Sequence, residues 1–202
     1  MTYTRKLSFD DYLGLEDTGY EGRMELVDGE LVELPPESGI NTEIAAIWFA
    51  ALLSSGVNLL HLKMGNCEIQ TPVLAPGDAA NRFPDVVVIR AEHRSLTQRR
   101  MTITLKMPPP RFVLAVVSPG EANRQRDYVR KRAQYAAAGI PEYVIVDPEE
   151  QTVTVLGLEQ GHYRTVGCYR GEQRVISPTF PNLTLTVNQV FACIEDHEKN
   201  VN

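Results

Sequence analysis

Short apolar runs, separated by turn-forming residues, recur along the chain and alternate with longer amphipathic stretches. Short runs that are rich in Val and Ile and bounded by Gly or Pro are typical of buried strands. This pattern predicts strands over 58–64, 67–74, 86–89, 102–105, 112–117 and 142–147. The dipeptide Gly65-Asn66 predicts that the first two of these strands form a hairpin. Later apolar runs predict a strand meander over 152–156, 162–167 and 172–176.

Helical spacing of apolar positions predicts the helices. Ser8 is expected to cap a short helix over 8–16, because its hydroxyl can accept a free N–H of the first turn. The longest buried helix is predicted over 38–55, a second long helix over 122–138, and a closing helix within 183–199. Two segments between these elements are predicted to be loops: 75–83 and 91–100.

A second hairpin is predicted in the N-terminal segment 24–34, which reads MELVDGELVEL. Asp28-Gly29 between two short runs is a strong signal for a two-residue turn. Alternation along the strands predicts that Met24 and Leu26 face the core, whereas Glu25 faces outward or across the hairpin.

The composition is that of a soluble globular protein, and its length fits one domain over 1–202. Three scattered cysteines without CxxC spacing predict neither a disulfide framework nor a zinc site, which fits a reducing cytoplasm. No apolar run approaches the length that spans a membrane, and the N-terminal segment lacks the apolar core of a signal peptide. We therefore expect a cytoplasmic protein with no membrane partner.

Charge is unevenly distributed along the chain. The net charge is −6, which argues against nucleic-acid binding over the whole surface. Residues 90–132, however, hold eleven Lys or Arg against three acids, a local charge of +8 that could steer a polyanion to one face. The alternative is a solvated helix face beside a basic loop. The side chains expected to contact a nucleic acid are Arg99, Arg100, Arg124, Arg126 and Arg130.

Candidate chemistry is concentrated in 82–135. Asp85 stands at the start of an apolar strand, where a carboxylate is costly unless it is paired, hydrogen-bonded or bound to a metal. The following helix places Asp127, Lys131 and Tyr135 on one face by i, i+4, i+8 spacing. A strand-borne acid, a second strand and a helix-borne cation form the layout of a metal-assisted phosphodiester site. Alternatives stay open: Asp85 as a turn cap, Asp127 and Lys131 as an ordinary helix ion pair, and Tyr135 as core packing.

The chain resembles the bacterial restriction endonuclease-like family of the PD-(D/E)XK nuclease superfamily. The resemblance rests on RMELVDGELVEL, on Pro84-Asp85 before VVVI, on VVSPGEANRQRDYVRKRAQYAAAGIPEYVIVDP and on SPTFPNLTLTVNQVF. It implies an α/β fold with a mixed sheet, in which the core over about 38–148 runs helix, three antiparallel strands, helix, strand. The N-terminal hairpin 23–34 and the C-terminal meander and helix 151–199 would then extend the sheet.

The resemblance also implies site residues. Asp85 matches the first metal-binding aspartate of the superfamily. The second acid falls at Ala115, so that ligand is absent, and no lysine follows at Val117. The cation comes instead from a D-x-x-x-K pattern on the helix, matched by Asp127 and Lys131. Acids that could replace the missing ligand are the hairpin acid Glu25 and the first-helix acid Glu43, and supporting roles fall to Ser118, Asp127 and Tyr135.

Two functions remain open. The first is an endonuclease that hydrolyses DNA with Mg²⁺ or Mn²⁺, held weakly because Ala115 cannot bind a metal. The second is a catalytically degenerate relative that binds nucleic acid or serves as a dimeric scaffold. A homodimer is plausible because the hairpin and the meander offer strand edges beyond the nuclease core. For Glu43, the alternative role is stabilisation of a helix N-terminus by its charge.

Overall fold

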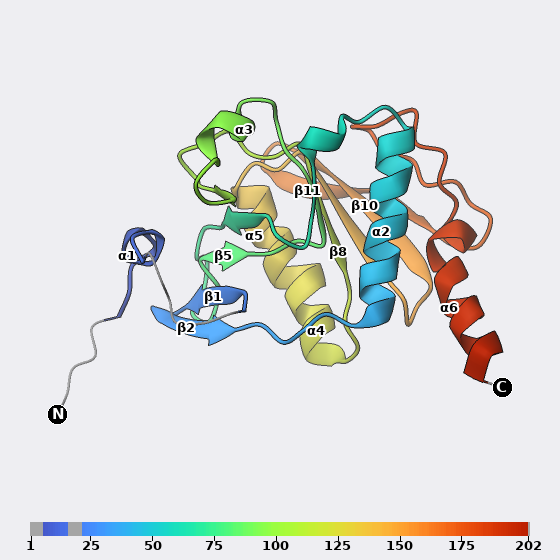
Figure 1. The fold of residues 1–202 in the computed structure, drawn as a ribbon, viewed down its shortest axis with the longest axis horizontal. Coiled ribbons are helices and arrows are strands. Elements are labelled where there is room, and N and C mark those ends of the chain that lie inside the picture. The colour runs from blue at the N-terminus through green and yellow to red at the C-terminus, as the bar shows by residue number, and fades with distance from the viewer. Residues whose placement is uncertain (1–5, 16–21, 202) are drawn as a thin grey trace.

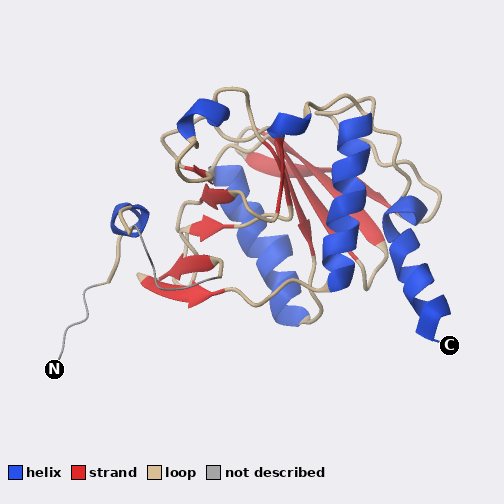
Figure 2. Ribbon diagram, in the orientation of Figure 1, coloured by secondary structure: helices blue, strands red, loops and turns tan. Residues whose placement is uncertain are grey.

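A six-stranded mixed sheet forms the centre of the protein in the computed structural model, which describes residues 6–15 and 22–201, with side chains to residue 194 (Figures 1 and 2). Its strand order is β11-β10-β9-β8-β6-β3. Only β8 and β9 are parallel; the other neighbours are antiparallel. The strands are β3 (Leu62–Met64), β6 (Val86–Val88), β8 (Phe112–Val116), β9 (Glu142–Asp147), β10 (Thr152–Glu159) and β11 (His162–Tyr169).

The order of elements confirms the restriction endonuclease-like core. Helix α2 precedes the antiparallel strands β3, β6 and β8, and a long helical segment then leads into β9. That segment has three parts, because a π-helical turn interrupts it. The helices are α2 (Gly39–Ser54), α4 (Glu121–Gln125), the π-helical η2 (Arg126–Lys131) and α5 (Arg132–Ala137).

Alternation along the strands divides the interior into two apolar layers. Val86 and Val88 pack in the layer beneath α2 and α6 (Val187–Val201), whereas Val87 and Ile89 pack in the layer beneath α5. Successive side chains of a strand point to opposite faces, so helices cover both sides of the sheet. Within the described residues, no helix is long and apolar enough to cross a membrane.

The N-terminal hairpin forms as predicted, but it does not extend the central sheet. Its strands β1 (Met24–Val27) and β2 (Glu30–Glu33) turn at Asp28-Gly29 and make a separate two-stranded sheet. Met24 and Leu26 are buried as expected, whereas Glu25 is also buried, against the prediction. A buried arginine partner, described below, accounts for this difference.

The predicted hairpin at Gly65-Asn66 is wrong. Strand β3 pairs with β6 of the central sheet, whereas the next strand enters a separate three-stranded sheet. The strands of that sheet, in spatial order, are β5 (Asn81–Arg82), β4 (Glu68–Gln70) and β7 (Thr102–Ile103). The predicted loop 75–83 thus contains β5, because Asn81 and Arg82 pair with β4.

Four other predictions differ from the structure. The basic segment 91–100 contains a short helix, α3 (His93–Leu96). Buried His93 organises it, because Nδ1 accepts the Arg90 N–H at 3.1 Å and Nε2 donates to the Pro108 carbonyl at 2.7 Å. The run 172–176 makes only an isolated bridge rather than a third meander strand. Helix α1 (Phe9–Leu13) starts at the predicted Ser8 cap but ends before residue 16, which lies outside the described residues. A 3₁₀ turn, η1 (Leu59–His61), replaces part of the predicted strand 58–64.

Candidate active site

A cavity of about 260 Å³ lies between the hairpin, the start of β6, the end of β8 and the helix that follows. Its wall includes Asp85 and Lys131, the two residues on which the predicted site chiefly depends. The other polar side chains of the wall are Glu25, Glu37, Ser38, Ser118, Asn123 and Arg126.

Asp85 is held at the end of the β6–β8 ladder. Its backbone N–H donates to the Leu114 carbonyl at 2.9 Å, and its Oδ2 accepts the Val116 N–H at 2.8 Å. The register pairs Val86 with Leu114, so continuing it by one pair places Ala115 across from Asp85. An acid at 115 would therefore face Asp85, but the methyl group that stands there is fully buried in the apolar layer beneath α5.

Burial raises the pKa of the Asp85 carboxyl to about 6, although the Lys131 ammonium and the Val116 N–H both favour the charged form. The negative charges of Glu37 and Asp127 add to the increase. At neutral pH Asp85 is thus a poorly solvated carboxylate near two other acids. This charged state is unfavourable for the protein without a bound cation.

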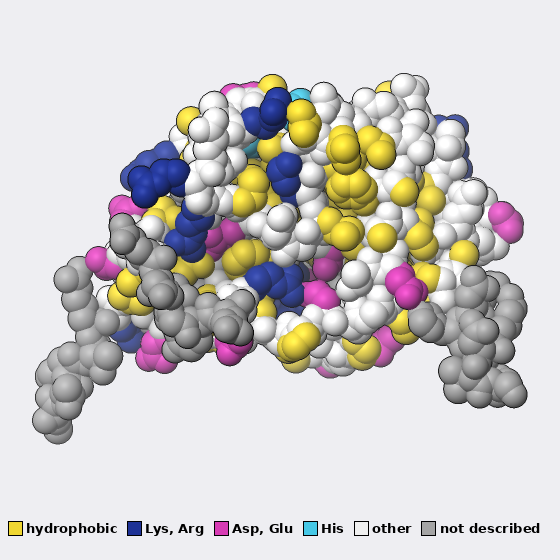
Figure 3. Space-filling model, viewed as in Figure 1, with side chains coloured by type: hydrophobic (Ala, Val, Ile, Leu, Met, Phe, Trp, Pro, Cys, Tyr) yellow, Lys and Arg dark blue, Asp and Glu magenta, His cyan; other side chains and the backbone are white. Residues whose placement is uncertain are grey.

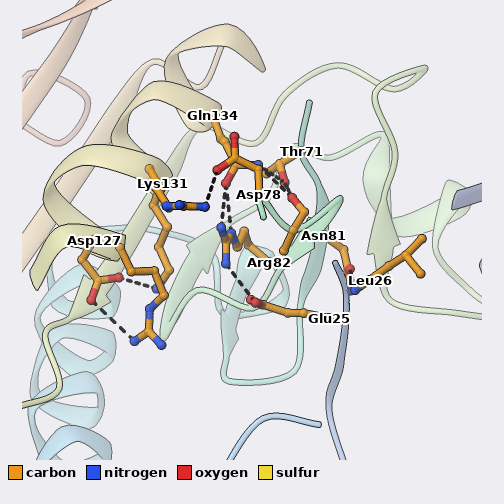
Figure 4. A network of polar contacts seen from close by, with 12 residues as sticks. Glu25, Leu26, Thr71, Asp78, Asn81, Arg82, Asp127, Lys131 and Gln134 are labelled. Carbon is orange, nitrogen blue, oxygen red and sulfur yellow. Dashed lines mark hydrogen bonds and ion pairs between the residues drawn. The ribbon is translucent and has the colours of Figure 1, made fainter. Parts of the chain in front are cut away.

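The π-helical turn η2 carries the cations of the cavity. Lys131 Nζ lies 2.5 Å from Asp127 Oδ1, and Arg126 lies 3.7 Å from Asp127 Oδ2 (Figure 4). Asp127 is fully buried, and within the described residues the two ion pairs with Lys131 and Arg126 compensate its charge. In an α-helix, residues five apart point about 140° away from each other. An i→i+5 turn is wider, so residue 131 turns back toward the side of residue 126, and both residues line the same cavity.

Glu25 also lines the cavity, but it is committed to a buried ion pair. Its Oε2 lies 2.9 Å from Arg82, whose guanidinium also donates to Gln134 Oε1 at 2.9 and 3.1 Å (Figure 4). Gln134 in turn donates to Thr71 and to the Ala79 carbonyl, so the network joins the hairpin to α5. Removing one partner of such a buried pair is strongly destabilising, which makes Glu25 a poor donor for any other ligand.

Glu37 is the acid that the sequence analysis did not consider. It lines the cavity beside Asp85 and forms an ion pair with Arg23 at 2.9 Å. Glu43, by contrast, lies on α2 outside the cavity wall. No local pattern singles out Glu37, because it stands in a connection whose position depends on the folded hairpin. The only sequence signal is its place between Pro35-Pro36 and the helix cap Ser38.

Of the residues predicted to support the site, Ser118 lies at the cavity and Tyr135 lies in the core. Ser118 lines the cavity, and its Oγ accepts the Asn41 amide N–H at 3.3 Å. Tyr135 is fully buried against Tyr143, with ring centroids 5.0 Å apart, and its hydroxyl has no hydrogen-bond partner in the described structure. Tyr135 is therefore a core residue, as the alternative interpretation held.

The predicted basic patch is divided. Arg126 lines the cavity, whereas Arg124 forms an ion pair with buried Asp147, and Arg130 lies 3.2 Å from Asp78. Arg99 and Arg100 line a separate depression of about 1020 Å³. Lys and Arg side chains on the face seen in Figure 3 accordingly lie in separate groups rather than in one continuous patch.

Comparison with known proteins gives the same assignment. The family described as "Uma2: Putative restriction endonuclease" matches residues 9–188. The chain belongs to this family. A crystal structure described as a putative nuclease belonging to DUF820, from Anabaena variabilis ATCC 29413, superposes with a TM-score of 0.67 at 19% identity. It covers 92% of this chain and 98% of that chain, which confirms the fold, whereas no curated protein matches.

The raised pKa of Asp85 predicts a measurable effect on stability. An acid whose pKa is higher in the folded state than in the unfolded chain stabilises the fold below the unfolded pKa, and this contribution is lost as pH rises through about 6. Asp85→Asn keeps an acceptor for Val116 but carries no charge. We expect it to raise the free energy of unfolding at pH 7.5 by about 2 kcal/mol, measured by urea unfolding. Asp10→Asn, at an exposed site, is the control; a destabilised Asp85→Asn would contradict the expectation.

Proposed function

We propose that this Uma2-family protein is a metal-dependent DNA endonuclease of low intrinsic activity, with Asp85 and Lys131 at its centre. The observation that carries the proposal is the shared cavity, in which a strand-borne carboxylate and a helix-borne ammonium face the same space. Family membership supports a nuclease, and DNA is the substrate that this class of protein suggests.

The residues of the cavity fit a weakly held divalent cation. Mg²⁺ and Mn²⁺ prefer oxygen donors, and Mg²⁺ is often bound by one or two carboxylates completed by water and substrate phosphates. Asp85 offers such a donor, and a cation beside it would relieve the unfavourable charge that raises its pKa. Within residues 6–15 and 22–194 no cluster of three acidic, His or Cys side chains could hold a metal without the substrate. Affinity should therefore depend on bound DNA.

Hydrolysis joins a water oxygen to phosphorus and breaks the bond to the leaving sugar oxygen. The attacking water gives up one proton to solvent and the leaving oxygen takes one from solvent, so the step balances. A divalent cation supplies charge neutralisation and a more acidic water when it is bound. Above pH 6 the Asp85 carboxylate would hold such a cation, while Lys131, oriented by Asp127, would stabilise the negative charge on the phosphoryl oxygens. Arg126, with a buried Nε that lacks a hydrogen-bond partner in the described structure, can donate to the same phosphate.

The second candidate is a DNA-binding or scaffold protein without cleavage. Ala115 favours it, because a methyl group occupies the place opposite Asp85. Within the part of the chain that the structure describes, β11 is an edge strand of the central sheet, which is compatible with the predicted homodimer. The two candidates make opposite predictions for DNA cleavage by the native chain.

A plasmid-nicking assay tests the proposal. With Mg²⁺ or Mn²⁺, the native chain is expected to nick supercoiled DNA slowly, and the rate should rise with pH through about 6 as Asp85 loses its proton. Asp85→Asn should lower the rate by a factor of about 100 or more, whereas Asp10→Asn should not change it. Nicking that persists in Asp85→Asn, or that needs no divalent cation, would refute this function.

A further inference from the structure

The acid expected across from Asp85 is absent, because buried Ala115 stands at that position. We propose, on the basis of the proposed function, that Glu37 supplies the second carboxylate for the divalent cation held by Asp85. The acid would then come from the connection between β2 and α2 rather than from β8, where Ala115 stands.

The position of Glu37 supports this role. It lines the same cavity as Asp85, so the two carboxylates border one common space. Pro35 and Pro36 restrict the backbone before it, and Ser38 caps α2 directly after it, with Oγ accepting the Asn41 N–H at 3.1 Å. The Glu37 backbone is therefore fixed between a stiff segment and a helix start.

The other acids near the cavity are committed elsewhere. Glu25 is buried with Arg82, and Asp127 is buried with Lys131, so neither can turn to a cation without leaving a buried charge unpaired. Glu43 does not line the cavity. Among the described residues that line the cavity, Glu37 is the remaining acid besides Asp85, and it can change partner.

The ion pair of Glu37 is of an exchangeable kind. Only one carboxylate oxygen, Oε1, meets Arg23, and both side chains are partly exposed, at 23% for Arg23 and 36% for Glu37. Pairs of this exposure contribute little to stability, so exchanging Arg23 for a divalent cation requires little energy.

Metal binding to the intact chain tests this assignment without relying on activity. Mn²⁺ affinity is measured by electron paramagnetic resonance of free Mn²⁺, in the presence of a non-cleavable phosphorothioate oligonucleotide. Glu37→Gln is expected to weaken Mn²⁺ binding about tenfold or more. Arg23→Gln, which releases Glu37, should leave the affinity unchanged or raise it. Ala115→Glu added to Glu37→Gln should restore binding to within about threefold of the native chain.

The outcomes separate this inference from the proposed function. Glu30→Gln, on the exposed strand β2, is the matched control and should bind Mn²⁺ as the native chain does. If Asp85→Asn abolishes binding but Glu37→Gln does not, Glu37 is not a ligand and the site at Asp85 stands. Equal losses in Arg23→Gln and Glu37→Gln would show a purely structural pair and overturn the inference. Absence of Mn²⁺ binding by the native chain would overturn both proposals.

Discussion

Ala115→Glu is expected to increase metal-dependent plasmid nicking about tenfold or more. The ladder register places residue 115 across from Asp85, on the face beneath α5, so a glutamate there would reach the place that a second metal ligand needs. Two carboxylates on adjacent strands form a compact oxygen pair, which holds a divalent cation more firmly than Asp85 with a distant partner. The gain in nicking rate should be largest when Ala115→Glu is added to Glu37→Gln, because that variant lacks the proposed second carboxylate.

The same substitution should lower stability in the absence of metal. Ala115 is fully buried, so a glutamate adds volume to a packed layer and a negative charge beside Asp85. Ala115→Gln, of equal size and no charge, separates the two effects. Thermal unfolding with and without Mn²⁺ should show a larger stabilisation by metal for Ala115→Glu than for the native chain. Unchanged nicking, or an equal gain with Ala115→Gln, would contradict the prediction.

The central fold could be predicted from the sequence because its signals are local. The apolar run that forms β6 and the helical spacing before Gly139 each identify an element without knowledge of its partner. Strand pairing is different, since it depends on residues far along the chain. Gly65-Asn66 signals a turn, yet β3 and β4 belong to separate sheets because β6 and β7 offer them different partners.

The same distinction between local signals and distant contacts applies to the candidate site. Asp85 and Lys131 follow from a family motif with fixed spacing, and the structure places both on one cavity. The contact between Glu25 and Arg82 joins residues 57 positions apart, and no sequence pattern announces it. The π-helical turn, which carries both Arg126 and Lys131 of the cavity wall, is also not predicted by a search for helical spacing. Tertiary contacts therefore determine which acids are available and which are already paired.

Lys131→Met is expected to abolish nicking and to lower the free energy of unfolding by about 3 kcal/mol. The stability loss follows from Asp127, a fully buried carboxylate that would keep only the more distant Arg126 as a cation. The methionine side chain preserves most of the apolar stem of lysine, so lost packing contributes little. Urea unfolding and the nicking assay measure the two effects on the same preparation.

The double variant Lys131→Met with Asp127→Asn separates the helix ion pair from the chemistry. Removing both charges avoids an unpaired buried carboxylate, so most of the lost stability should return. Cleavage should not return, because the cavity still lacks the ammonium that faces Asp85 and the substrate phosphate. A double variant that regains both would reduce Lys131 to a structural partner of Asp127. Recovery of stability alone would show that one ammonium neutralises a buried acid in the free protein and stabilises phosphoryl charge during cleavage.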